Sequence, residues 1–193
     1  MNKKPELILA SASPNRLDLL RSIGLEPDEI SPADIDETPH KDELPKNHVL
    51  RLAQSKASKV AETHKGNFII AADTIGYLGR KIIGKAKDEN EARKILSMLS
   101  GRRHKVYSGL CVIAPDGRKR SRCIITIVKF KKLERDELEE YLKSGQWKGK
   151  SGCYGIQSRA GGFIEWINGS FSNVVGLPLA ETRKLLCGLG YKF

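Results

Sequence analysis

The stretch LILASASPNR, residues 7–16, carries hydroxyls and a guanidinium directly after an apolar run. Pro14 fits the first position of a helix, and Ser13 has the side chain of an N-terminal cap. Arg16 then lies in the first helical turn, where a cation opposes the positive end of the helix dipole by about 0.3–1 kcal/mol. A bound anion would compensate, so the hydroxyls of Ser11 and Ser13, Arg16 and the free backbone N–H groups predict a phosphate or carboxylate site. The alternative is a solvated arginine beside an ordinary cap.

A second apolar run, in NFIIAADT at residues 67–74, leads to Asp73 and Thr74. We expect these side chains just past the carboxyl end of a buried strand, as the two serines are on the first run. Ligands of open α/β sheets gather at that edge, so parallel neighbouring strands would turn all these groups toward one crevice. The alternative for Asp73 is an ordinary turn residue.

Further groups are candidates for the same crevice. The acidic loop DIDETP at 34–39 can supply one carboxylate to magnesium, and Lys85 can contact phosphate from the end of a strand. Gln157 can offer a donor and an acceptor to a base edge, or simply end a strand. Arg51 and Lys56 are five residues apart and lie on different helical stripes, so one faces the crevice and the other faces solvent.

Composition restricts the class of protein. The chain has 193 residues, of which 39% are hydrophobic and 30% are charged, as in a protein with its own core. No apolar run could span a bilayer and the first residues do not resemble a signal peptide, so we expect a cytoplasmic protein with no membrane partner. Four scattered cysteines without a C-x-x-C pair indicate neither a zinc site nor a disulfide framework.

The net charge of +11 favours polyanionic ligands, which include nucleic acids, anionic membranes and small phosphorylated substrates. The basic residues are scattered, and no alternation of basic and aromatic residues is visible. We therefore expect no stable nucleic-acid partner, although a nucleic-acid binding module remains an alternative.

The elements that must position these side chains follow from hydrophobic periodicity. Strands are predicted near 6–10, 68–72, 75–83 (a hairpin through LGRK), 104–114, 122–132 and 162–167, and helices at 14–23, 46–63, 88–99, 134–143 and 178–187. Helices and strands alternate at first and strands dominate later. This order predicts an α/β fold with a mixed twisted sheet and flanking helices, in a single domain over 1–193 with a cleft.

An ordered set of short motifs resembles the Maf family of nucleoside triphosphate pyrophosphatases. The motifs are LILASASPNRLDLL, RLAQSKA, AADT, LSGRRHKVYSG, YGIQ and GSFSNVVGLPL, in this order over nearly the whole chain. The resemblance implies two lobes around a central cleft, a fold related to inosine triphosphate pyrophosphatases, and a homodimer. It also implies hydrolysis between the α- and β-phosphates, with Mg²⁺ or Mn²⁺ as the cofactor, to remove surplus or modified nucleotides.

The resemblance also implies roles for individual residues. Asp73 would be the proton acceptor that prepares the attacking water and would also hold metal, and Glu37 would be a second metal-associated carboxylate. The triphosphate would be bound by five residues that carry hydroxyls or positive charge, namely Ser11, Ser13, Arg16, Lys56 and Lys85. A family link to septum formation leaves a third reading, a regulator that binds a division partner.

The base is the least determined part of the substrate. Family members that act on dTTP and UTP often have Arg at position 15, and members that act on 7-methyl-GTP have an aromatic residue there. This chain has Asn15. Ala86 replaces a usual proline, and Gly-Lys at 149–150 replaces an Asp-Lys pair. Thr74 and Gln157 still follow the dTTP/UTP subgroup, so the resemblance favours dTTP, UTP or modified pyrimidine nucleotides.

Overall fold

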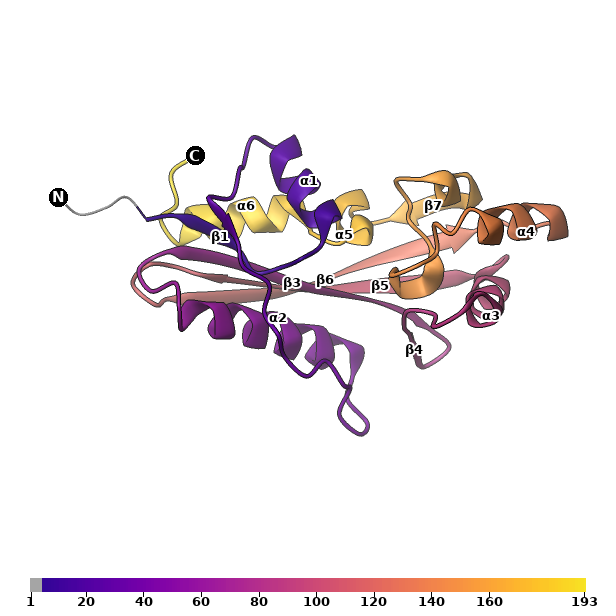
Figure 1. Cartoon of the computed structure of the whole chain (residues 1–193), viewed down its shortest axis with the longest axis horizontal. Coiled ribbons are helices and arrows are strands. Elements are labelled where there is room, and N and C mark those ends of the chain that lie inside the picture. The colour runs from indigo at the N-terminus through magenta and orange to yellow at the C-terminus, as the bar shows by residue number, and fades with distance from the viewer. Residues whose placement is uncertain (1–4) are drawn as a thin grey trace. The chain divides into compact units, whose positions relative to one another are not determined.

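A computed structural model describes residues 5–193 of the chain (Figure 1). Seven strands, six α-helices and two short 3₁₀ helices follow one another in these residues. In chain order they are β1 (Leu7–Leu9), α1 (Pro14–Ser22), β2 (Glu29–Ile30), α2 (Pro45–Ala61), β3 (Phe68–Leu78), β4 (Lys81–Ile83), α3 (Glu89–Leu99), β5 (Arg103–Ile113), β6 (Lys119–Phe130), α4 (Arg135–Lys143), η1 (Ser151–Cys153), η2 (Arg159–Phe163), β7 (Ile164–Asn168), α5 (Phe171–Val175) and α6 (Leu179–Gly188).

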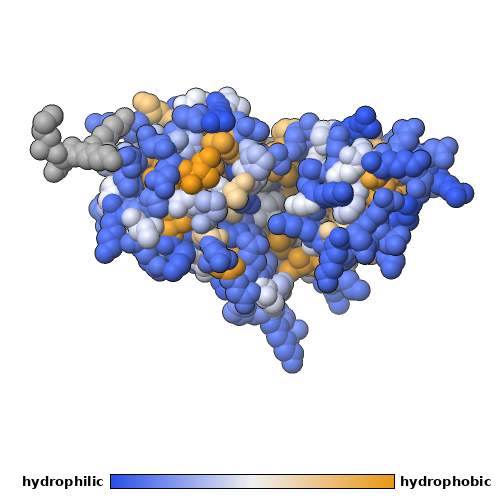
Figure 2. Space-filling view, viewed as in Figure 1, coloured by the Kyte–Doolittle hydropathy of each residue, from blue (hydrophilic) through white to orange (hydrophobic). Residues whose placement is uncertain are grey.

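The strands form one sheet in the order β2-β1-β3-β5-β6-β7, with β4 hydrogen-bonded to β3. β1 pairs in parallel with β2 and β3, whereas the β3–β4 and β6–β7 pairs are antiparallel. The predicted α/β class with a mixed sheet and flanking helices is confirmed. Hydrophilic side chains cover most of the face shown in Figure 2, in keeping with the charged fraction of 30%.

The described chain divides into two compact units. The first comprises the residues up to Asp73, Ser108–Ile124 and Gly176–Phe193, and the second comprises Thr74–Tyr107 and Ile125–Val175. No helix within residues 5–193 is long and apolar enough to cross a membrane.

In the first unit, helices cover both faces of the sheet. Leu7 and Leu9 of β1 pack in a cluster with residues of α1 and α6, while Ile8 packs in a cluster with residues of α2. Figure 1 shows α2 on one side of these strands and α1 and α6 on the other. At the contact between α2 and β5, a Cβ on Gly109 would lie 1.9 Å from the carbonyl oxygen of Val49, so only glycine fits there.

The strand that carries Asp73 differs from the prediction. β3 is one strand of 11 residues that runs through Asp73 and Thr74, whereas we expected a strand that ends before them. The strand continues because its partner changes. The parallel pairing with β1 reaches Leu9 opposite Ile70, and the antiparallel pairing with β4 begins with Gly76. Asp73 thus lies beyond the carboxyl end of β1 rather than of its own strand.

Other predictions need smaller corrections. β2 and α5 were not predicted, because two and five residues are too short to show a period. Ser13 occupies the N-cap position of α1, but its side chain makes no capping hydrogen bond. The hairpin through LGRK is confirmed, with Gly79 and Arg80 both at positive φ between β3 and β4.

The core of the second unit contains a buried histidine. His104 is 2% exposed, packs against the ring of Phe130, and its Nε2 lies 2.8 Å from the hydroxyl of Tyr154. Burial lowers the pKa of His104 from 6.5 to about 4, because the surroundings disfavour the charged imidazolium. His104 is therefore neutral at pH 7.

We expect this histidine to make the protein less stable in mild acid. Between pH 6.5 and about 4 the unfolded chain binds a proton at His104 that the folded chain excludes. The free energy of unfolding should fall by about 1.4 kcal/mol per pH unit from this group alone. Urea unfolding at pH 7, 6 and 5 should show a shallower decline for His104→Gln than for the parent. Parallel declines would contradict the assignment.

Candidate active site

Lys56 joins two carboxylates in the first unit. It lies on the buried face of α2, in register with Ala53 and Val60, and is 8% exposed. Its Nζ lies 2.8 Å from Oδ1 of Asp73 and 2.6 Å from Oε1 of Glu37. The side chain of Asp73 is 9% exposed and that of Glu37 is 52% exposed, so the ion pair runs from the interior toward solvent.

Glu43 anchors the loop that carries Glu37. Its Oε1 accepts from Nε of Arg51 at 2.7 Å and its Oε2 from Nη2 at 2.8 Å, and His48 Nδ1 lies 2.9 Å away. The Nη2 of Arg51 also donates to the carbonyl of Thr38 at 3.1 Å. The hydrogen bonds from Arg51 hold the pKa of Glu43 well below its usual range. These contacts fix the loop at Thr38 and Glu43, directly after Glu37.

The two basic residues of α2 lie on different stripes of the helix as predicted, but the expectation that one of them faces solvent is wrong. Lys56 points inward to the carboxylates, whereas Arg51 is half-buried and bound by Glu43. Sequence reasoning did not find Glu43, because eight residues and a turn separate it from Arg51 and no helical spacing signals the pair.

Arg16 is held by two protein acceptors at the start of α1. Its Nη1 donates to Oγ of Ser11 at 2.9 Å, and its Nε donates to the carbonyl of Gly176 at 2.9 Å. In the described part of the chain Nη2 has no protein acceptor. Burial lowers the pKa of Arg16, and the negative charges of Asp73 and Glu37 oppose that shift. The guanidinium is thus fixed beside the carboxylates with one nitrogen available to an anion.

Gly176 is a second residue that sequence reasoning missed. It lies 160 positions from Arg16 in the chain and adopts a φ of 136°. Residues other than glycine rarely adopt this backbone conformation. A Cβ there would be in ordinary contact with Arg16 Nε at 3.7 Å, so backbone strain rather than lack of space would disturb the carbonyl.

We expect Gly176→Ala to weaken anion binding about tenfold, because Arg16 would lose one of its two anchors. Isothermal titration with inorganic triphosphate measures this directly. Gly24→Ala is the matched control, since Gly24 has a φ of 74° in the same unit and a Cβ there would meet nothing within 4 Å. An equal loss of triphosphate affinity in both variants would show that Gly176→Ala acts through backbone strain and not through the position of Arg16.

The remaining predicted residues of the first unit lie near this cluster in sequence. Ser13 and Asn15 are half-buried at the start of α1, and the backbone N–H of Ser13 donates to Oγ of Ser11 at 3.2 Å. The first unit therefore brings together one hydroxyl, two cations and two carboxylates, from Ser11, Arg16, Lys56, Glu37 and Asp73.

Three predicted residues belong to the second unit. Thr74 follows Asp73 in β3, and alternation along the strand turns its side chain to the opposite face. Lys85 follows β4 and Gln157 follows η1, and both are exposed. Neither Lys85 nor Gln157 has a side-chain hydrogen bond in the part of the chain that the structure describes.

The donor set fits a magnesium-type ion rather than zinc. Among residues 5–193 no cluster of three or more His, Cys, Asp or Glu side chains could hold a metal. Asp73 and Glu37 can supply two carboxylate oxygens, and magnesium takes one or two carboxylates together with water and substrate phosphates. The predicted metal residues are therefore chemically suitable only when an anionic substrate completes the site.

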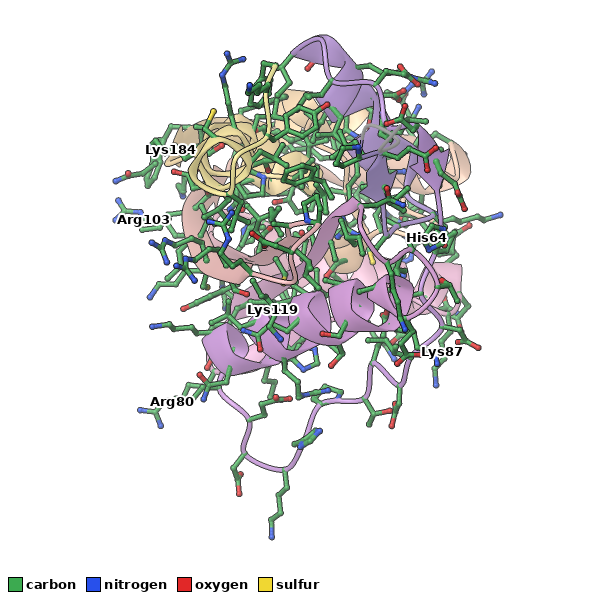
Figure 3. All side chains as sticks on the ribbon, turned by 90° about the vertical axis from the view of Figure 1, so that its left-hand side faces the viewer. His64, Arg80, Lys87, Arg103, Lys119 and Lys184 are labelled. Atoms are coloured by element: carbon green, nitrogen blue, oxygen red, sulfur yellow. The ribbon has the colours of Figure 1, made fainter. Side chains whose placement is uncertain are left out.

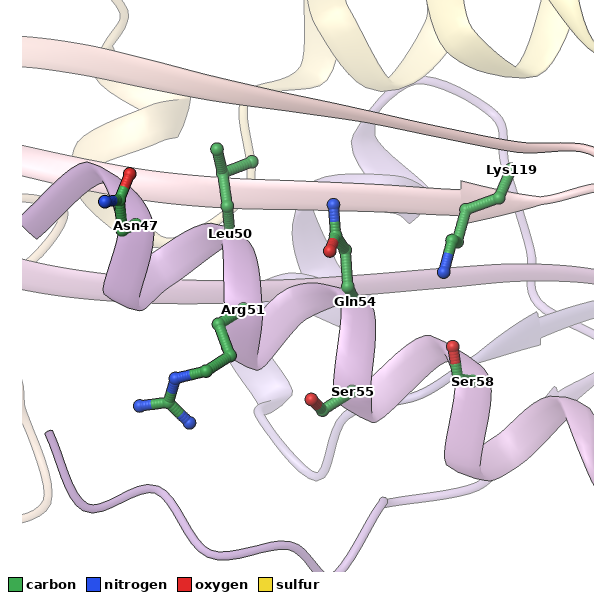
Figure 4. Close-up of a pocket in the computed structure, with 7 residues that line it drawn as sticks. All are labelled: Asn47, Leu50, Arg51, Gln54, Ser55, Ser58 and Lys119. Atoms are coloured by element: carbon green, nitrogen blue, oxygen red, sulfur yellow. The ribbon is translucent and has the colours of Figure 1, made fainter. Parts of the chain in front are cut away.

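A groove of about 510 Å³ lies on the first unit (Figure 4). It is lined by residues of α2 and one of β6, namely Asn47, Leu50, Arg51, Gln54, Ser55, Ser58 and Lys119. Lys56 and Asp73 do not line it, and the guanidinium of Arg51 is already bound by Glu43. This groove is separate from the carboxylate cluster.

Comparisons with known proteins agree with the motifs. Residues 6–189 match the family model described as Maf-like protein. A "dTTP/UTP pyrophosphatase" of Caulobacter vibrioides is 54% identical over 188 residues, which cover 97% of each chain. One of Rhodospirillum rubrum is 50% identical over 186 residues, or 96% of this chain and 89% of that protein. Among solved structures, a HAM1 protein from Coxiella burnetii is similar over 68% of this chain and 76% of its own, with 17% identity and a TM-score of 0.47.

Proposed function

Because the chain belongs to the Maf-like protein family, we propose that it is a nucleoside triphosphate pyrophosphatase. It hydrolyses the bond between the α- and β-phosphates and yields a nucleoside monophosphate and pyrophosphate. The observation that carries this proposal is the buried ammonium of Lys56 between Asp73 and Glu37, with the guanidinium of Arg16 fixed nearby. A general base, two cations and a pair of carboxylates for a metal ion are the groups that phosphate-anhydride hydrolysis needs.

The proposed mechanism assigns a role to each side chain of the site. Asp73 accepts a proton from the water that attacks the α-phosphorus, and the bridging oxygen leaves with pyrophosphate. Lys56, Arg16 and the hydroxyl of Ser11 bind phosphate oxygens and stabilise the negative charge that develops there. A bound Mg²⁺ or Mn²⁺, held by Asp73 and Glu37, would neutralise charge and orient the triphosphate.

The proposed substrates are dTTP and UTP. Two relatives at 50–54% identity carry these substrates in their names. The resemblance of the motifs associates Thr74 and Gln157 with the same subgroup. Gln157 is exposed and can offer both an amide donor and a carbonyl acceptor to a pyrimidine edge. Asn15, at the start of α1, is a proposed substrate-binding residue that matches neither subgroup. A cytoplasmic location, a homodimer and a role in septum formation stay predictions from the sequence.

The activity is tested with purified protein, MgCl₂ or MnCl₂, and a panel of UTP, dTTP, CTP, ATP, GTP and 5-methyl-UTP. We expect one pyrophosphate per nucleoside monophosphate from UTP and dTTP, and loss of the activity with EDTA. Release of orthophosphate and nucleoside diphosphate would contradict cleavage at the α–β bond. Equal rates on all five natural triphosphates would contradict the proposed pyrimidine preference.

A further inference from the structure

An uncovered face of the sheet in the second unit places cations beside an exposed aromatic ring. The backbone N–H of Phe130 donates to the carbonyl of Arg102, and this antiparallel register puts Arg103 opposite Lys129. Lys129 is in turn paired with Trp166 on β7. One row across β5, β6 and β7 therefore contains Arg103, Lys129 and Trp166, and all three side chains share one face.

The next row on this face contains Lys105, Ile127 and Asn168, and Ile125 lies two residues before Ile127. The alternate residues of β5 and β6, such as His104 and Val128, point to the opposite face and are buried. We call the uncovered set the basic platform, defined as Arg103, Lys105, Ile125, Ile127, Lys129 and Trp166. Ile125 is 46% exposed and Trp166 is 38% exposed, so these apolar side chains of the platform are open to solvent.

The platform carries positive charge without acidic partners. The guanidinium carbon of Arg103 lies 5.0 Å from the centroid of the Trp166 ring, a cation–π distance. In the part of the chain that the structure describes, neither Arg103 nor Lys105 pairs with a carboxylate. Only Lys129 is neutralised, by Glu165 at 3.8 Å, and it also donates to the carbonyl of Gly101. Figure 3 shows Arg103 at the periphery of the molecule.

We propose that the basic platform binds single-stranded nucleic acid. Residues two apart on a strand are about 6.8 Å apart, and neighbouring strands about 4.8 Å, so one chain can reach both a cation and the ring. Arg103 and Lys105 would contact phosphates, and a base would stack on Trp166. A sheet face with an aromatic ring and unpaired cations suits unpaired bases, because a duplex hides its base faces.

The charge of the platform argues against a second copy of this chain as the occupant. In a two-fold dimer the same patch meets itself, so Arg103 and Lys105 would face their own counterparts. The linear sequence does not reveal the platform, since its residues come from three strands. The proposed binding is weak and salt-sensitive, which is compatible with the expectation of no stable nucleic-acid partner.

The test is fluorescence anisotropy of labelled dT₁₂ and U₁₂ with the full chain at 50 and 200 mM salt. Trp166→Ala should weaken binding about tenfold and Trp166→Phe should restore most of it, because stacking contributes about 1–3 kcal/mol per base. Lys105→Ser should weaken binding several-fold. Lys184→Ser removes the same charge from a lysine in the first unit that is 77% exposed, and should change binding less than twofold.

Three results would overturn the proposal. The first is no binding at 50 mM salt. The second is an equal loss of oligonucleotide affinity in Lys105→Ser and Lys184→Ser, together with unchanged affinity in Trp166→Ala. That result would mean that the oligonucleotide is attracted by the net positive charge of the whole protein. The third is a dimer in sedimentation that dissociates with Trp166→Ala, which would assign the platform to a second copy. Pyrophosphatase activity is not the readout, so failure of the proposed function would leave this result unaffected.

Discussion

Asp73→Asn is expected to lower the turnover of the preferred triphosphate about a thousandfold, because the amide cannot accept the proton of the attacking water. The substitution preserves size and hydrogen-bonding geometry, and Lys56 keeps Glu37 as its partner at 2.6 Å. The melting temperature should therefore change by no more than about 4 °C, which corresponds to about 1 kcal/mol in a protein of this size. Single-turnover pyrophosphate release and a thermal melt measure the two effects.

The control for Asp73→Asn is Asp36→Asn in the acidic loop. Asp36 is exposed and accepts a hydrogen bond from the backbone N–H of Thr38 at 2.8 Å. The substitution therefore removes one negative charge near Glu37 and leaves the ion pairs of Lys56 in place. We expect its turnover to stay within about threefold of the parent. Undiminished turnover in Asp73→Asn would exclude Asp73 as the base. A loss of similar size in Asp36→Asn would mean that net charge, not proton transfer, is responsible.

The sequence predicted the local parts of the site well. Pro14 and the leucine spacing placed the start of α1 correctly, and the helical stripe of α2 separated Lys56 from Arg51. These features depend on the 3.6-residue period and on proline geometry, which act over a few residues.

The parts that failed depend on contacts that are distant along the chain. Asp73 was placed after a strand because the apolar run ends there, but β4 supplies a new partner and β3 continues. The carbonyl of Gly176 reaches Arg16 from 160 residues away, and the platform row joins β5 to β7. A periodic pattern contains no information on such pairings, since it reports only which side of an element is buried.

The ammonium of Lys56 explains how the carboxylate of Asp73 can be buried beside a second, exposed carboxylate, that of Glu37. Asp73 is 7% exposed, and an unpaired charge in that position would be costly. Lys56 compensates it in the absence of substrate, and Arg16 lies close enough for its charge to interact with Asp73. Under the proposed function, a divalent metal held by Asp73 and Glu37 would neutralise these carboxylates and leave the two cations for phosphate oxygens.

Lys56→Met is accordingly expected to damage both stability and activity. Removal of the ammonium leaves the buried carboxylate of Asp73 without its nearest counterion, so the free energy of unfolding should fall by about 3 kcal/mol. Turnover should fall about a hundredfold, the usual cost of one lost donor to developing phosphate charge. Lys59→Met is the matched control on α2, because Lys59 is 56% exposed and pairs only with Glu62 across the surface. We expect it to cost less than about 1 kcal/mol.

The double variant Lys56→Met/Asp73→Asn separates the two effects of Lys56. If the stability loss comes from an uncompensated carboxylate, neutralising Asp73 should recover about 2 kcal/mol of it, while turnover stays as low as in Asp73→Asn. Urea unfolding of the four members of this cycle gives the coupling energy. An additive cycle would mean that Lys56 stabilises α2 by packing of its aliphatic stem alone, and the ion pair with Asp73 would then be a feature of the site without energetic weight.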